Sequence, residues 1–105
     1  MADIREYLDQ RGQSSYKVWF DRLNPQAAAK VATVLTRLAL GNVSNVKGVG
    51  SGVFEFRIDF GPGYLVYFGK DGERLIILLS GGIKKRQQQD ISDAIAKWED
   101  YKRRK

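Results

Sequence analysis

The side chains best suited to chemistry in this sequence are a basic residue on an expected strand and a basic cluster just before an expected helix. Arg57 lies in the alternating segment 53–60, at a position facing away from the buried residues. Its planar guanidinium suits two phosphate oxygens at once. Lys84, Lys85 and Arg86 follow the last apolar strand and precede a helix, whose first amide groups also attract phosphate. Together these residues predict a site for a polyanion, and RNA is the first candidate.

Cleavage of RNA without a metal would set these side chains three tasks. The 2′-hydroxyl must lose a proton, the attacked phosphate needs its extra charge stabilised, and the leaving 5′-oxygen needs a proton. The chain has no His, so the base would be a Lys or a Tyr with a lowered pKa, and Arg and Lys would stabilise the charge. The candidate catalytic residues are Arg57, Lys84, Lys85 and Tyr64.

Further contacts to RNA are predicted around this site. Tyr64 and Tyr67 could stack on a base or donate a phenolic proton, and strand alternation predicts that only one of them is exposed. Lys47 in a glycine-rich loop and Arg86 in the basic cluster are candidate phosphate contacts. A basic tail that would touch RNA or an acidic partner is formed by Lys102, Arg103 and Arg104.

Each of these residues also has a purely structural interpretation. Arg57 could form an exposed ion pair with Glu55, Asp59 or a residue across the sheet, since such pairs are common and weak. The cluster 84–86 could be a solvated charge run. Either tyrosine could pack in the core, and the tail could be a frayed end that aids solubility.

Length and composition restrict the class of protein. At 105 residues with a hydrophobic fraction of 43%, the chain is expected to form one domain over 1–105. The net charge of +6 favours anionic partners, and most of it lies after Ile83, where eight basic residues face four acidic ones. Without Cys or His, disulfides, thiol chemistry and the usual zinc sites are excluded, and neither a metal nor another cofactor is expected. No leader or membrane span is recognised, which predicts a cytoplasmic protein.

The first half of the chain predicts a short strand and two helices. The strand is expected at Ile4–Leu8. Ser14 or Ser15 would cap a helix with Tyr16, Trp19, Phe20 and Leu23 on one face, and Asn24-Pro25 would start a second helix over Gln26–Leu40. Val43–Gly52 is rich in glycine and reads as a loop.

The second half predicts three antiparallel strands and a helix. The strands are expected at Val53–Phe60, Tyr64–Phe68 and Leu75–Leu79, with Gly81-Gly82 ending the last, and the helix from about Gln87 to Lys102. The predicted class is α+β, in the order β-α-α-β-β-β-α: a small antiparallel sheet with an N-terminal helical hairpin and a C-terminal helix. One sheet face would be buried and the other, with Arg57, open to water.

Three segments carry a resemblance to a known family. RLALGN, GVGSGVFEFRIDFGPGYLVYF and LLSGGIKKRQQQDI are similar to addiction-module killer proteins, the phage Gp49-like, HigB-type toxins of the RelE/ParE superfamily. The resemblance covers about Tyr16 to Trp98 and implies the fold just described. It further implies a toxin held in check by a cognate antitoxin of the helix-turn-helix, HigA-like type. HigB- and RelE-type toxins cut mRNA on the ribosome, whereas ParE-type toxins poison DNA gyrase.

Two positions depart from the family pattern. Leu65 stands where members commonly have an arginine that supports catalysis, and Ile83 stands where they commonly have an acidic residue. The leading hypothesis is a ribosome-dependent endoribonuclease that needs no metal. A gyrase inhibitor and a catalytically attenuated toxin that only binds its antitoxin are the alternatives, and whether the protein forms a homodimer stays open.

Overall fold

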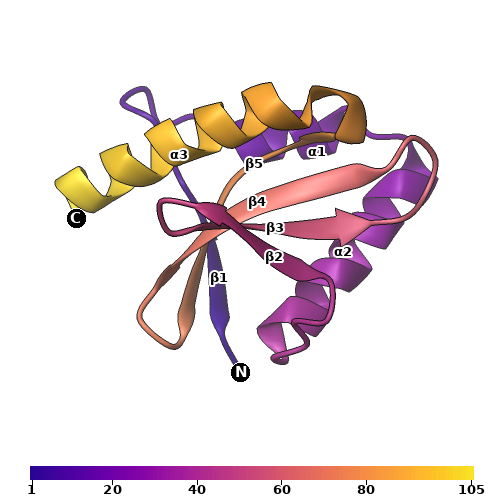
Figure 1. Cartoon of the computed structure of the whole chain (residues 1–105), viewed down its shortest axis with the longest axis horizontal. Coiled ribbons are helices and arrows are strands. Elements are labelled where there is room, and N and C mark those ends of the chain that lie inside the picture. Colours follow the sequence, from indigo (N-terminus) through magenta and orange to yellow (C-terminus); the bar gives the residue numbers. More distant parts are fainter.

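The computed structural model describes residues 1–105 as a five-stranded sheet with helices on both faces (Figure 1). The elements are β1 Asp3–Glu6, α1 Ser15–Asp21, α2 Pro25–Ala39, β2 Val46–Gly50, β3 Val53–Ile58, β4 Tyr64–Asp71, β5 Leu75–Ile83, the 3₁₀ turn η1 Lys84–Arg86, and α3 Gln87–Arg104. The strand order is β1-β5-β4-β3-β2, parallel only between β1 and β5. The predicted α+β class is confirmed, with one strand more than expected.

The two N-terminal helices cover one face of the sheet. The Ser14 hydroxyl accepts the Lys17 amide at 3.0 Å and the Asn24 side chain accepts the Ala27 amide at 2.8 Å, so both predicted caps are present. The residues of this core come from α1, α2 and the inner positions of the strands, among them Tyr16, Val31, Leu38, Phe56, Ile58, Val66, Phe68 and Leu78. The apolar stripes predicted the buried faces of both helices.

The segment expected to be a loop contains the edge strand β2. Lys47 pairs with Glu55 and Gly48 with Phe54 of β3, and the register shifts at a bulge between Gly48 and Gly50. Gly50 and Gly52 have φ angles of +105° and +84°, which a side chain would strain. The glycines therefore make the bulge and tight turn of a hairpin, and the ordering of β2 depends on its pairing with β3.

The Gly81-Gly82 pair does not end β5, contrary to expectation. The strand continues to Ile83, which pairs with Tyr64. A Cβ on Gly81 would lie 2.2 Å from the Trp19 ring, and one on Gly82 would lie 2.0 Å from Oδ2 of Asp90. The two glycines thus allow side chains from the helices on opposite faces to approach the strand closely.

Helix α3 covers the face that was predicted to be open. Ala94 and Trp98 of α3 are buried against Val53, Leu65, Ile77 and Leu79. On β3, the end of this face at Arg57 stays exposed, whereas Val53 and Glu55 on the same strand are buried. None of the helices combines the length and apolar character that crossing a membrane requires.

Candidate functional site

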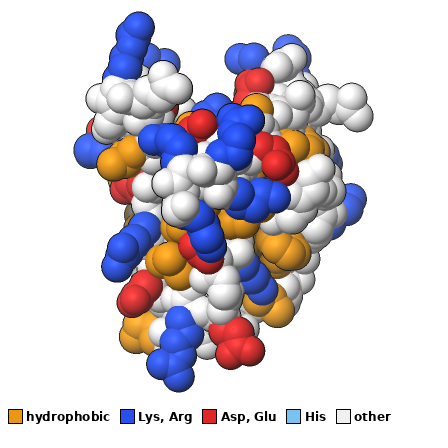
Figure 2. All heavy atoms as spheres, turned by 90° about the vertical axis from the view of Figure 1, so that its left-hand side faces the viewer, with side chains coloured by type: hydrophobic (Ala, Val, Ile, Leu, Met, Phe, Trp, Pro, Cys, Tyr) orange, Lys and Arg blue, Asp and Glu red, His pale blue; other side chains and the backbone are white.

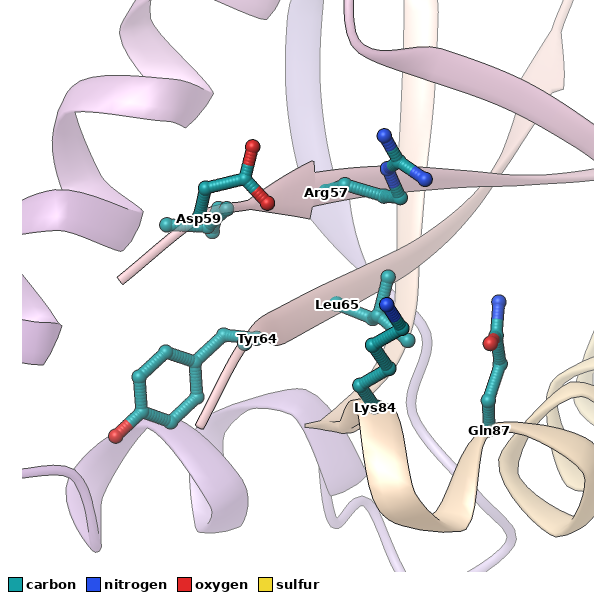
Figure 3. Close-up of a pocket in the computed structure, with 8 residues that line it drawn as sticks. Arg57, Asp59, Tyr64, Leu65, Lys84 and Gln87 are labelled. Carbon is teal, nitrogen blue, oxygen red and sulfur yellow. The ribbon is translucent and has the colours of Figure 1, made fainter. Parts of the chain in front are cut away.

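A cleft of about 100 Å³ opens where β3 ends, β4 begins and η1 leads into α3 (Figure 3). The lining residues are Arg57, Ile58, Asp59, Gly63, Tyr64, Leu65, Lys84 and Gln87. Two cations, one carboxylate and one amide thus surround a small apolar floor. The cleft lies at the end of β3 that α3 leaves exposed.

Strand pairing places Arg57 and Lys84 on the same side of the cleft. Arg57 lies opposite Leu65 of β4, and Leu65 lies opposite Gly82 of β5. The Lys84 amide donates to the Gly63 carbonyl at 3.0 Å, which fixes the start of η1 against the β3–β4 turn. Figure 3 shows Arg57, Lys84 and Gln87 extending toward the same side, beside Leu65. The predicted convergence of Arg57 with the basic cluster is present for Lys84.

Neither cation of the cleft is neutralised within the protein. Arg57 and Lys84 are exposed and take part in none of the ion pairs within 4.0 Å. The alternative of an exposed pair between Arg57 and Glu55 or Asp59 is therefore not observed. Two free positive charges beside one another can bind an anion without first breaking an internal contact.

A buried carboxyl group and an amide adjoin these cations, and neither was predicted to belong to the site. Glu55 was expected to face water, yet it is 1% exposed, because α3 passes over it. The Gln87 side chain donates from Nε2 to both carboxylate oxygens of Glu55, at 2.8 and 3.0 Å. The strand alternation that placed Arg57 also places Glu55 on this face, but the position of α3 could not be read from it.

Tyr64 contributes to the wall of the cleft, but its phenol points elsewhere. The ring extends away from Arg57 and Lys84 (Figure 3). It packs edge-on against Trp19, with ring centroids 6.4 Å apart, in the core beneath α1 and α2. The structure therefore does not place the Tyr64 hydroxyl among the cations, as a proton donor would require.

Tyr67 is fully buried, which contradicts the expectation that it contacts RNA. Its side chain is 0% exposed under α3, and its hydroxyl has no hydrogen-bond partner. Burial, with further contributions from Glu55 and Asp90, raises the pKa of the Tyr67 phenol, so this residue lacks the lowered pKa that a tyrosine base would need. Both tyrosines are core residues that point to opposite faces of the sheet.

Removing the Tyr67 hydroxyl is expected to leave the protein as stable as before or more stable. A buried hydroxyl without a partner costs about 1–3 kcal/mol, and Tyr67→Phe relieves that cost while keeping the ring. Denaturant unfolding of Tyr67→Phe measures the change. Ser80→Ala is a parallel test that should give the same result, because the Ser80 hydroxyl is also buried without a partner. A loss of more than about 1 kcal/mol would show that the hydroxyl bonds to an internal water.

The other predicted basic contacts near this site lie outside the cleft. Lys47 is exposed on β2 opposite Glu55, one row of the sheet away from Arg57. Lys85 and Arg86 are exposed on η1 next to Lys84 but do not line the cleft. Ile83 packs against the α1–α2 core, so the position where the resemblance led us to expect an acidic residue faces away from the cations.

The basic tail lies at the other end of α3. This helix has 18 residues and so spans about 27 Å. Lys102 pairs with Glu99, whereas Arg103 and Arg104 pair with Asp100, and Arg104 also donates to the Leu8 carbonyl. Figure 2 shows this end of the molecule, where basic and acidic side chains alternate. The ion pairs lie within α3, so only the contact of Arg104 with Leu8 joins this group to another segment. The structure does not bring these residues to the site.

The anchoring of this helix end is expected to weaken in acid. Asp100 accepts the Tyr7 hydroxyl at 2.7 Å, and Asp71 accepts Lys105 Nζ at 2.7 Å and the Tyr101 hydroxyl at 2.6 Å. The Tyr7 hydrogen bond lowers the pKa of Asp100, and the Lys105 hydrogen bond lowers that of Asp71. Because the folded values lie below the ordinary 3.8, this stabilisation is complete above that pH and disappears as the pH falls through the lowered values. Melting temperatures measured from pH 6 down to pH 2 should fall less steeply for Tyr7→Phe, and equal slopes would contradict this account.

Acidic side chains do not gather in a group of three that could hold a metal ion. The polar side chains that line the cleft and could bind a ligand are those of Arg57, Lys84, Asp59 and Gln87.

Comparison with known proteins gives two matches. The profile of the family described as phage-derived protein Gp49-like matches residues 18–100. An uncharacterized protein of Haemophilus influenzae is 42% identical over 81 residues, which cover 76% of this chain and 82% of that protein. The matched range includes every residue that lines the cleft.

Proposed function

We propose that this chain, which belongs to the phage-derived Gp49-like protein family of addiction-module toxins, is the toxin of a type II toxin–antitoxin pair. As a HigB-type member of the RelE/ParE superfamily, it would inhibit translation by cutting mRNA on the ribosome without a metal. Its partners would be that mRNA and a cognate helix-turn-helix antitoxin of the HigA-like type, and it would act in the cytoplasm.

The observation that carries this proposal is the pair of unneutralised cations in one cleft. Arg57 and Lys84 can together contact the oxygens of one phosphodiester, since a guanidinium and an ammonium both bind phosphate without a metal. When the 2′-hydroxyl attacks, the phosphate gains negative charge, and cations at this place stabilise that charge most in the transition state. Asp59 is the only carboxylate among the lining residues, which makes it the available acceptor for the 2′-hydroxyl proton. The ammonium group of Lys84 is the available donor of a proton to the leaving 5′-oxygen.

Induced expression in growing cells tests the function. Primer extension on transcripts from translating ribosomes should show new 5′ ends within minutes of induction. Arrested growth with intact transcripts would contradict the nuclease, and DNA breaks with an SOS response would instead indicate a gyrase inhibitor. Co-expression with the product of a short neighbouring gene for a DNA-binding protein should restore growth.

A second candidate function follows from Leu65. This side chain is 2% exposed and provides the apolar floor beside Arg57, at the position where nuclease relatives are expected to carry a third cation. A toxin homologue with weak or no turnover that still binds its antitoxin would retain the fold and lack the growth phenotype. Tight complex formation without transcript cleavage would support this candidate.

A further inference from the structure

Glu55 is a buried carboxyl group with one hydrogen-bonding partner. Its side chain is 1% exposed and takes part in no ion pair within 4.0 Å. Both of its oxygens accept from Nε2 of Gln87. Burial of a carboxylate with so few partners is unfavourable for folding. The pair is therefore a candidate for a functional role, and it adjoins the cleft through Gln87.

The contact with Glu55 decides which atom Gln87 presents to the cleft. A carboxylate only accepts hydrogen bonds, so the NH₂ group of the amide must face Glu55 and the oxygen must face elsewhere. Gln87 lines the cleft, and Figure 3 shows its nitrogen at the tip of the side chain with the oxygen beside the chain below it. That oxygen accepts no hydrogen bond within the protein. Beside two cations that attract phosphate, the cleft thus offers one fixed, unused acceptor.

An acceptor next to a bound phosphate selects for a neighbouring donor. In RNA, the 2′-hydroxyl of the adjoining ribose is the backbone donor closest to the phosphate, and DNA lacks it. We propose that Oε1 of Gln87 accepts a hydrogen bond from a ribose 2′-hydroxyl flanking the phosphate held by Arg57 and Lys84. Glu55 is the positioning residue that keeps the amide in this orientation. This inference rests on the proposed function, since it assumes that the cleft takes RNA.

Binding of matched RNA and DNA strands tests the inference. The probes are fluorescent single strands of twelve nucleotides with the same sequence, as RNA, as 2′-deoxy and as 2′-O-methyl strands, followed by anisotropy at low salt. The unmodified protein should bind RNA about fivefold more tightly than either modified strand, the effect of one net hydrogen bond. Gln87→Met should bring this ratio close to one by weakening RNA binding alone, and Glu55→Gln should lower it by releasing the amide.

The control variant changes a residue of α3, and the fallback variant combines changes in α3 and β3. Gln88→Met changes an exposed neighbour outside the cleft and should keep the full ratio. Because Gln87→Met leaves Glu55 without a partner, Glu55→Leu/Gln87→Met provides a variant without a buried charge, and it should also show a ratio near one. An unchanged preference for RNA in either folded variant overturns the inference while the proposed function stands. If the protein shows no RNA binding that Arg57→Ala weakens, both this inference and the proposed function are overturned.

Discussion

Arg57→Ala is expected to abolish growth inhibition while the protein stays folded. The guanidinium is exposed and forms no ion pair, so its removal breaks no salt bridge and should change the free energy of unfolding by no more than about 0.5 kcal/mol. Its loss removes a fixed positive charge from the cleft. Deletion of one such charge-stabilising donor lowers a rate by about 100- to 1000-fold. Cleavage of mRNA on purified translating ribosomes measures the effect.

Three further variants make this result specific. Arg37→Ala removes an exposed, unpaired guanidinium from α2, on the far side of the sheet, and should leave cleavage unchanged. Arg57→Lys keeps the charge but loses the planar fork and should give an intermediate rate. Lys84→Ala should also lower the rate without unfolding the protein. If Arg57→Ala remained fully toxic, the site would lie outside this cleft.

Binding to the antitoxin separates loss of chemistry from loss of structure. A folded Arg57→Ala protein should still form the toxin–antitoxin complex, since antitoxin recognition covers a surface much larger than one side chain. Co-purification of the variant with its antitoxin therefore provides a second readout. Loss of both cleavage and complex formation would mean that Arg57 lies in the shared interface.

The sequence predicted that Arg57 and the start of the basic cluster at Lys84 lie near one another, because their placement depends on local structure. Alternation along β3 fixed the face on which Arg57 lies, and the change from an apolar strand to a helix fixed the position of the basic cluster. Alternation could not predict which part of that face α3 covers. Glu55 and Arg57 occupy equivalent positions two residues apart, yet α3 buries the first and leaves the second exposed.

The glycines were misinterpreted for a related reason. Gly81-Gly82 has the composition of a break, and only the approach of Trp19 and Asp90 from opposite faces shows why small residues are needed within a continuous strand. In the same way, β2 has little strand propensity of its own and becomes ordered through its pairing with β3. Both features depend on tertiary neighbours rather than on local preference.

The basic tail illustrates the limit of charge counting. Counting charges along the sequence grouped Lys102, Arg103 and Arg104 with Lys84, because the sequence gives the sign of each charge but not the distance between charges in space. The continuous helix of 18 residues separates the two groups, and local acids neutralise the second. A basic residue is therefore better evidence for a site when it lacks an acidic partner three or four positions away on the same helix.

Trp98→Ala is expected to lower the free energy of unfolding by about 3–5 kcal/mol, the cost of deleting a large buried side chain. The indole is 5% exposed and fills the space between α3 and the sheet. It stacks on Tyr101 at 5.2 Å between ring centroids and lies so close to Gly69 that a Cβ there would be 2.5 Å from the ring. Since small domains are stabilised by only about 5–15 kcal/mol in total, this single change should leave the fold marginal. Denaturant unfolding followed by circular dichroism measures the loss.

Loss of the Trp98 packing should also disturb the cleft, because α3 carries Gln87 at its first turn and follows η1, which begins at Lys84. If Trp98 anchors this helix, Trp98→Ala should reduce RNA cleavage and stability together, in contrast to Arg57→Ala. Trp98→Phe keeps an aromatic ring over Gly69 and should recover most of both. Gly69→Ala probes the same contact from the sheet and should be destabilising, since the added methyl group meets the ring. A Trp98→Ala protein that unfolds within about 1 kcal/mol of the unmodified one would show that α3 is held by its end contacts, Tyr7 with Asp100 and Tyr101 with Asp71, rather than by this packing.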